Sequence, residues 1–137
     1  MKVLVDTNVV LDVLLARTPF VKQAASVFAL VEESRVEASL CATTLTTVDY
    51  LLAQSLPRVQ ARRAIRSLLK LFEIAPVNRS VLERALDSKI EDFEDAVLEQ
   101  AGCLIGADAI ITRNTKDFRK SAIKVLDPVE FLSALDM

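Results

Sequence analysis

The chain of 137 residues contains no histidine and no tryptophan, and it has only two cysteines. The lack of histidine excludes Ser-His and Cys-His catalysis, a histidine general base and the usual zinc sites. Cys41 and Cys103 lack metal-ligand spacing, and we expect both to be reduced, small core residues of a cytoplasmic protein. Any chemistry must therefore depend on carboxylates, lysine, hydroxyl groups or a hard metal ion.

Glycine, proline and aromatic residues are also scarce: there are two glycines and four prolines, and 5% of the chain is aromatic. With 52% hydrophobic residues, we expect one globular domain over residues 1–137 with a core of Val, Leu, Ile and Ala. No apolar run approaches the roughly 20 residues needed to span a bilayer, and no signal peptide is expected. The net charge of −2 does not favour non-specific binding to long duplex nucleic acid.

Short apolar runs alternate with helical patterns along the whole chain. The expected strands are residues 3–5, 36–41, 72–75, 109–112 and 124–126. The expected helices are residues 8–15, 20–34, 43–54, 58–72, 80–88 and 92–103, with a last one opening at 127–128. This alternation predicts an α/β fold with a parallel β-sheet of about five strands, flanked by helices on both faces. Ligands of such sheets bind outside the carboxyl ends of the strands.

Acidic and amide side chains stand where several of these elements begin or end. Asp6 directly follows the strand 3–5, and Asn114 and Asp117 follow the strand 109–112, so both groups should lie at one edge of the sheet. Asp92 and Asp95 are three residues apart and share a helical face. A further acid, Asp49, lies in the apolar stretch TTLTTVDYLL, where an unpaired carboxylate would be costly.

Each of these acids also has a structural interpretation. Asp6 and Asp92 fit helix caps, with Thr7 or Asn8 as further cap candidates, and Asp117 fits a surface acid. We expect structural, turn or solvated positions for Asp12, Asp108, Glu91 and Glu94, and leave Glu99 open.

The functional interpretation is a cluster of carboxylates. Carboxylates gathered in one place raise one another's pKa unless a cation neutralises them. Oxygen ligands without histidine or cysteine select Mg²⁺ or Mn²⁺. Such ions bind phosphate oxygens and activate water for in-line attack, so phosphoryl or phosphodiester transfer is the expected chemistry.

Four segments, taken together and in order, resemble the motifs of the PIN-domain family: VLVDTNVVLD, TTLTTVDYLL, DFEDAVLEQAG and ADAIITRNTKDF. The resemblance covers essentially the whole chain, and DVLLARTPF, FEDAV and VLDPVEFL are similar to a toxin-like branch. It implies a Mg²⁺- or Mn²⁺-dependent endoribonuclease that leaves 5′-phosphate and 3′-hydroxyl ends. It further implies the toxin of a toxin–antitoxin pair, commonly a homodimer, with RNA and an antitoxin as partners. No membrane partner is expected, because no apolar run is long enough to span a bilayer.

The resemblance also assigns roles by position. The catalytic acids would be Asp6, Asp49, Asp95 and Asp117. The metal would be held by Asp6, Asp92, Asp95, Asn114 and Asp117. The side chains that orient these ligands would be Thr7, Asn8, Thr43 and Thr112. Asp49 stands where the family usually has Glu, and its shorter side chain would reach the metal through a water.

Positive charge is segregated from these acids, because residues 50–72 contain no Asp or Glu. A helix over this segment would carry a basic stripe, and the loop after residue 112 adds further positive charge. The predicted RNA contacts are Arg58, Arg62, Arg66, Lys70, Arg113 and Lys116. The stripe equally fits an ordinary solvated helix face.

Two other functions remain open at this point. The departure at Asp49 fits a catalytically weak binding module that acts through a protein or RNA partner. A phosphotransfer or signalling domain of similar sheet topology fits less well, because Lys124 opens the last strand instead of ending it.

Overall fold

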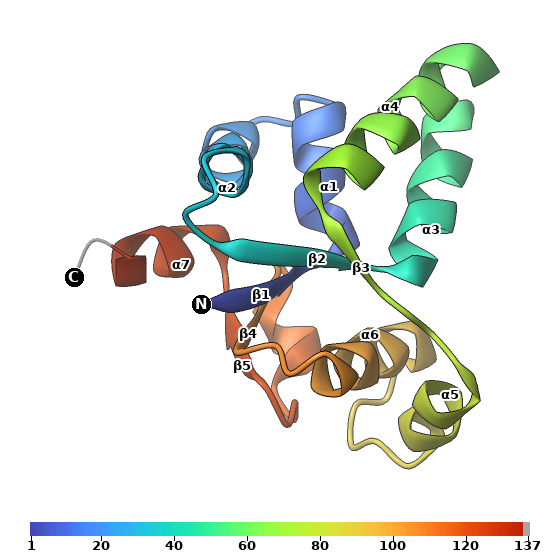
Figure 1. The fold of residues 1–137 in the computed structure, drawn as a ribbon, viewed down its shortest axis with the longest axis vertical. Helices are drawn as coiled ribbons and strands as arrows, with labels where there is room; N and C mark the ends of the chain where they lie inside the picture. The colour runs from blue at the N-terminus through green and yellow to red at the C-terminus, as the bar shows by residue number, and fades with distance from the viewer. Residues whose placement is uncertain (136–137) are drawn as a thin grey trace.

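The computed structural model describes residues 1–135, and within them five strands form a single sheet in the order β3-β2-β1-β4-β5 (Figure 1). All neighbouring strands are parallel. Their bounds are β1 Lys2–Val5, β2 Glu37–Cys41, β3 Glu73–Ala75, β4 Ala109–Ile111 and β5 Lys124–Leu126. The predicted five-stranded parallel sheet is confirmed, and the predicted strands are correct to within one residue at each end.

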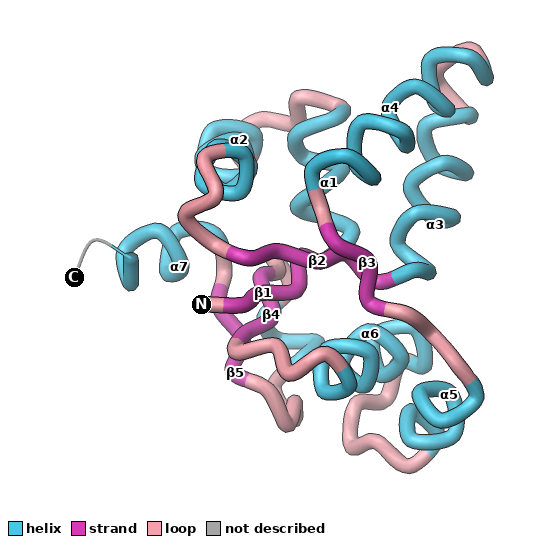
Figure 2. Tube along the Cα trace, in the orientation of Figure 1, coloured by secondary structure: helices cyan, strands magenta, loops and turns pink. Residues whose placement is uncertain are grey.

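Helices connect the strands and cover both faces of the sheet (Figures 1 and 2). The bounds are α1 Thr7–Leu14, α2 Val21–Glu32, α3 Ala42–Ala53, α4 Arg58–Leu71, α5 Arg79–Leu86, α6 Phe93–Leu104 and α7 Pro128–Leu135. A short 3-10 helix, η1 Thr115–Phe118, follows β4, where the sequence predicts a loop. None of the helices in the described part of the chain is long and apolar enough to cross a membrane.

The central strand β1 is buried on both faces, which explains its uninterrupted apolar sequence. Val3 and Val5 point to one face and Leu4 to the other, and all three are fully buried. The neighbouring strand β4 alternates in the same way, with Ile111 on the first face and Ile110 on the second. Each such side chain contributes about 2 kcal/mol by leaving water, so β1 is fixed firmly in the middle of the sheet.

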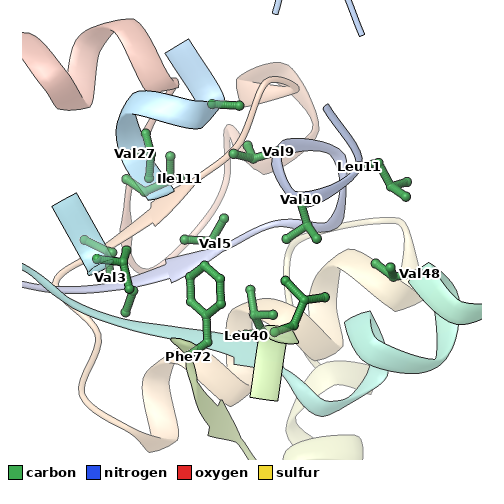
Figure 3. Packing of buried hydrophobic residues seen from close by; sticks show 14 of the residues in the cluster. Val3, Val5, Val9, Val10, Leu11, Val27, Leu40, Val48, Phe72 and Ile111 are labelled. Carbon is green, nitrogen blue, oxygen red and sulfur yellow. The ribbon is translucent and has the colours of Figure 1, made fainter. Parts of the chain in front are cut away.

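One face of the sheet is covered by α1 to α4, with α7 beside α2 and β5. Figure 3 shows Val9 and Val10 of α1, Val27 of α2 and Val48 of α3 packed with the side chains of β1 and β4. Phe72, which ends α4, packs in the same cluster. The burial of Val9 and Val10 anchors α1 directly behind the end of β1, so the residues between them have little freedom.

The other face is covered by α5 and α6, which lie on the opposite side of the sheet in Figure 1. Gly102 allows α6 to lie close to β1, because an added Cβ would come 2.9 Å from the side chain of Ile123 and 3.2 Å from that of Leu4. This close approach places the N-terminal turn of α6 near the carboxyl end of β1.

The two cysteines are free and differ in burial. Cys41 ends β2 and is buried, as the sequence predicts. The core position predicted for Cys103 is wrong: the residue is exposed. The helical periodicity of α6 turns Ala101 and Gly102 to the sheet, so the next residue faces solvent.

The connections run in opposite directions from the ends of β1 and β4. The chain leaves β1 toward β2 on one side, whereas β4, on the other side of β1, continues toward β5. A crevice forms at such a switch point, outside the carboxyl ends of the two strands. Asp6 and Thr112 are the first residues beyond these strands, so the fold places both at this crevice.

Candidate active site

Asp6 is held at the end of β1 by hydrogen bonds of its backbone N–H and of its carboxylate. Its backbone N–H donates to the carbonyl of Ile111 at 2.9 Å, which continues the β1–β4 pairing. Its Oδ1 accepts from the N–H of Thr7 at 2.7 Å, so Asp6, and neither Thr7 nor Asn8, caps α1. Its Oδ2 accepts from the Thr112 hydroxyl at 2.8 Å and from the Asn8 amide at 3.3 Å. All donors to this carboxylate are neutral.

Asp6 is 8% exposed, and the burial of its carboxylate raises the pKa of this group. The hydrogen bonds from Thr112 and Thr7 lower the pKa, whereas the negative charges of Glu94 and Asp117 raise it further. The net shift is upward, which shows that the neutral donors do not offset the burial of this charge.

Asn8 and Thr112 connect the segment after β1 to the segment after β4. The Asn8 amide donates to the Thr112 hydroxyl oxygen at 3.1 Å, and its Oδ1 accepts from the N–H of Arg113 at 3.1 Å. The same hydroxyl oxygen accepts from the N–H of Asn114 at 3.1 Å. Of the four side chains predicted to orient the ligands, those of Asn8 and Thr112 therefore form one network around Asp6, in which Thr112 is fully buried.

The hydroxyl contact expected from Thr43 is made by the next residue. Thr7 donates its hydroxyl to that of Thr44 at 3.1 Å, and Thr44 is buried in the first turn of α3. The Thr43 hydroxyl instead lies 3.2 Å from the sulfur of Cys41. Successive residues of a helix are rotated by about 100°, so Thr44 faces Thr7 and Thr43 does not.

A second group of acids comes from the start of α6. Asp92 caps the helix, with its Oδ2 accepting from the N–H of Asp95 at 3.0 Å. Burial and the charges of Asp6, Asp92, Asp117 and Glu94, in that order, raise the pKa of Asp95 to about 7. Charges act over short distances in solvated surroundings, so we treat these carboxylates as one group. We call them the acid cluster: Asp6, Asp92, Glu94, Asp95 and Asp117.

An open hollow of about 600 Å³ lies beside the acid cluster. Its acidic lining residues are Glu91, Asp92, Asp95 and Asp117. Its basic lining residues, which we call the basic rim, are Lys89, Lys116, Arg119 and Lys120. The hollow therefore presents carboxylates and cations side by side. None of the lysines or arginines in residues 1–135 forms an ion pair with Asp6, Asp92, Asp95, Asp117 or Glu94.

Asp49 does not join the acid cluster. Its Oδ1 accepts from Nε of Arg62 on α4 at 3.1 Å. It is also absent from the charges that raise the pKa of Asp6 and Asp95. The partner that stabilises this mid-helix carboxylate is thus an arginine of the basic stripe.

Arg113, predicted to contact RNA, is engaged inside the protein. Its Nε and Nη2 donate to the two oxygens of Asp12 at 2.6 and 3.2 Å, and its guanidinium lies 3.9 Å from the ring centroid of Phe20. Asp12 is 1% exposed and also accepts from Arg17 at 2.8 Å. Asp12 is therefore structural, as expected, and Arg113 fixes the segment after β4 to α1.

The other predicted RNA contacts lie on exposed positions of α4 and on the basic rim. Arg58, Arg62, Arg63 and Arg66 line a separate hollow of about 520 Å³, next to Val59. Lys70 is exposed one turn further along α4. Lys116 is the one predicted contact that lines the hollow of the acid cluster.

The sequence interpretation assigns no role to two further acids, Glu94 and Glu99. Glu94 is exposed, as the sequence predicts, but its negative charge raises the pKa of both Asp6 and Asp95, and its Oε1 lies 3.4 Å from the Thr47 hydroxyl. Its position in the first turn of a helix that Asp92 caps was the available signal.

Glu99, left open by the sequence, is 2% exposed. Its carboxylate accepts from the Ser88 hydroxyl at 2.6 Å, the Gln100 amide at 2.9 Å and the N–H of Ala122 at 2.8 Å. It thereby ties together the two loops that carry the basic rim. A glutamate in the interior of an otherwise apolar helical stretch was the available signal.

The donor set of the acid cluster fits a hard divalent cation, because it offers oxygen atoms only and, within residues 1–135, no lysine or arginine forms an ion pair with it. Within residues 1–135, no three such side chains already stand close enough together to hold an ion. The carboxylates would therefore converge on a cation as it binds. A cation would also offset the burial and the neighbouring negative charges, which together raise the pKa of Asp95.

The sequence profile of the PIN domain family matches residues 2–116, and the chain belongs to this family. The chain is 26% identical over 139 residues to Ribonuclease VapC1 of Aquifex aeolicus, a match covering 95% of this chain and 92% of that protein.

Two solved structures have the same fold. One is a chain of VapBC2 from Rickettsia felis bound to a DNA fragment from its promoter, with a TM-score of 0.73, 13% identity, and coverage of 93% of this chain and 98% of the other. Another is a chain of a toxin–antitoxin complex from Klebsiella pneumoniae, with a TM-score of 0.70, 23% identity, and coverage of 92% and 97%. The predicted PIN-like fold is thereby confirmed.

Proposed function

We propose that the chain is a Mg²⁺- or Mn²⁺-dependent endoribonuclease that acts as the toxin of a toxin–antitoxin pair. The observation that supports this most is the acid cluster at the carboxyl ends of β1 and β4, where Asp95 reaches a pKa of about 7 without a neutralising side chain. Similarity to a ribonuclease and to chains of toxin–antitoxin complexes supports the reaction class and the partner.

The metal would be held by the acid cluster. Asp6, which Thr7, Asn8 and Thr112 already orient, would be the central ligand. Its further ligands would be Asp92, Asp95, Asn114 and Asp117. When bound, the cation supplies charge for the scissile phosphate and lowers the pKa of a water, which explains how the chain functions without histidine.

The RNA backbone would lie along the basic rim. Lys89, Lys116, Arg119 and Lys120 line the same hollow as the acids, so phosphates held by these side chains would bring a neighbouring phosphate to the acid cluster. The arginines of α4 line a different hollow and are the second candidate for backbone contact. We place the protein in the cytoplasm with its RNA substrate, as a homodimer in complex with an antitoxin.

A cleavage assay tests the reaction directly: the protein is first stripped of metal, and RNA cleavage is then measured with and without added cation. We expect a single-stranded RNA to be cut at pH 8 with added Mn²⁺ or Mg²⁺, to remain intact with EDTA, and to leave 5′-phosphate and 3′-hydroxyl ends. Asp6→Asn and Asp95→Asn should abolish cleavage. Equal cleavage by wild type and both variants would indicate a contaminating nuclease and refute the proposal.

A second candidate is a binding module without catalysis, and the ion pair of Asp49 with Arg62 favours it because α3 then contributes no acid. Titration calorimetry with Mn²⁺ separates the two functions. A nuclease site should bind Mn²⁺ in a manner that depends on Asp6, whereas a binding module should show no such dependence.

A further inference from the structure

We infer that Glu94 is a further carboxylate of the metal site, in the role that the sequence assigns to Asp49. This inference rests on the proposed metal-dependent function and concerns which side chains hold the ion. It predicts that Glu94 contacts the cation directly, and that no acid of α3 does so.

The position of Glu94 in α6 brings it to the site. The helix begins at Phe93 immediately after its cap Asp92, so Glu94 and Asp95 both belong to the first turn. Oε1 of Glu94 lies 3.4 Å from the hydroxyl of Thr47 on α3. Glu94 therefore bridges the gap between α6 and α3 at the edge of the sheet where Asp6 lies.

The charge of Glu94 supports the same placement. This negative charge raises the pKa of Asp6, which directly follows β1, and the pKa of Asp95, which lies next to Glu94 in α6. Its negative charge therefore acts on both acids. Since Glu94 is exposed and makes only one side-chain hydrogen bond in the described structure, its side chain is free to turn toward a cation.

The geometry of α3 explains why Asp49 is not available. Successive residues of a helix are rotated by about 100°, so Thr44 and Thr47 share one face and Asp49 lies roughly 200° from Thr47. Thr44 contacts Thr7 and Thr47 contacts Glu94, so this shared face is the one turned to the site. Asp49 points to α4 and pairs with Arg62.

The face of α3 at the site thus carries hydroxyl groups only. A hydroxyl donates a hydrogen bond to a carboxylate but is a poor ligand for Mg²⁺ or Mn²⁺ compared with the carboxylate itself. Thr47 would therefore orient Glu94, and Glu94 would bind the ion. This division of roles places the carboxylate of α6 where α3 contributes none.

Calorimetric titration with Mn²⁺ at pH 8 tests the inference without measuring activity. At this pH Asp95, with its pKa of about 7, is largely ionised, so removing a neighbouring charge does not act through its protonation. We expect Glu94→Gln to weaken Mn²⁺ binding by about tenfold or more. Two controls each remove one negative charge elsewhere: Glu91→Gln, at an acid that lines the same hollow, and Asp49→Asn. Both should bind within about twofold of wild type.

The outcomes separate the inference from the proposed function. Wild-type Mn²⁺ affinity in Glu94→Gln would overturn the role of Glu94, and so would an equal loss of affinity in Glu94→Gln and Glu91→Gln. In either case the proposed function would stand if Asp6→Asn abolishes Mn²⁺ binding. A loss in Asp49→Asn that matches the loss in Glu94→Gln would overturn the role of Glu94 as well. Failure of wild-type protein to bind Mn²⁺ would instead refute the proposed function. Circular dichroism would show that each variant is folded, which the exposure of Glu94 leads us to expect.

Discussion

Two buried aspartates lie six residues apart in the segment VLVDTNVVLD, and the protein surrounds them differently. Asp12 is 1% exposed and accepts hydrogen bonds from two arginines, Arg17 and Arg113. Asp6 is 8% exposed and accepts only from neutral donors. Burial alone therefore does not distinguish a structural acid from one available to a ligand. The two acids differ instead in the charge of the groups that donate hydrogen bonds to them.

The difference has an energetic meaning. A buried carboxylate is costly unless it is paired, and the chain pairs Asp12 internally. At Asp6 the surrounding charges have the same sign, since Glu94 and Asp117 raise its pKa. Its charge can be neutralised only by protons or by a cation from solution. Asp12 therefore stabilises the fold, and Asp6 is available to bind an ion.

Replacement of Asp6 by Asn should produce the largest effect, and this effect should be on RNA cleavage and not on stability. We expect RNA cleavage to fall by more than about 100-fold, because the central ligand loses its charge. The free energy of unfolding should change by less than about 1 kcal/mol, since Asn still accepts from Thr7 and removes a charge surrounded by acids. Single-turnover cleavage and urea denaturation measure the two quantities.

The matched variant is Asp12→Asn, whose cleavage per folded molecule should stay within about tenfold of wild type, because Asp12 does not touch the acid cluster. Full cleavage by Asp6→Asn would mean that Asp6 serves only to cap α1, and the distinction between the two aspartates would fail.

The reverse result is expected for stability. Asp12→Asn should lower the free energy of unfolding by about 3 kcal/mol, because it leaves Arg113, whose side chain is 25% exposed, without its partner. Arg17→Gln should cost less, about 1 kcal/mol, because the side chain of Arg17 is 38% exposed. Urea denaturation at constant m-value measures both. Equal stability of Asp12→Asn and Asp6→Asn would show that the arginine pairs do not stabilise the fold.

The stability of the protein should depend on pH through the acid cluster. Because the pKa of Asp95 rises from 3.8 to about 7 on folding, the folded protein holds a proton that the unfolded chain releases between these values. Without divalent cations, the free energy of unfolding should therefore fall as pH rises from about 4 to about 7. Because Asp95 is only half-buried, we expect a decrease of about 1 kcal/mol.

Asp95→Asn is the control for this dependence, since it should remove this part of the slope. Added Mn²⁺ should raise the stability of wild type at pH 8 more than at pH 5.5, because protons and the cation compete for the same carboxylates. An unchanged slope in Asp95→Asn would assign the dependence to other groups.

The sheet and the position of Asp6 follow from local patterns, and these the sequence predicts well. Apolar runs such as Val3–Val5 mark buried parallel strands, and residues that follow such strands must meet at one edge. Arg113 could not be assigned, because its pairing with Asp12 depends on how β4 lies beside β1. The roles of Asp49 and Glu94 depend on the phase of α3 and on the approach of α6, and a shift of a residue or two reverses which face an acid occupies. Hydrophobic periodicity does not fix helix ends that closely.

The smallest changes in stability and cleavage are expected at Asp49, because its ion pair with Arg62 lies at the surface. Its partner Arg62 has a side chain 51% exposed, and that of Asp49 is 28% exposed. Asp49→Asn and Arg62→Gln should each lower the free energy of unfolding by less than about 1 kcal/mol, with a coupling energy of about 0.5 kcal/mol in a double-mutant cycle. Cleavage by Asp49→Asn should stay within about twofold of wild type, because α3 presents Thr44 and Thr47 to the site and turns Asp49 to α4. A loss of cleavage comparable to that of Asp6→Asn would place Asp49 in the metal site. An acid with an arginine partner would then also serve the chemistry, and the charge of its partners would no longer separate structural acids from functional ones in this fold.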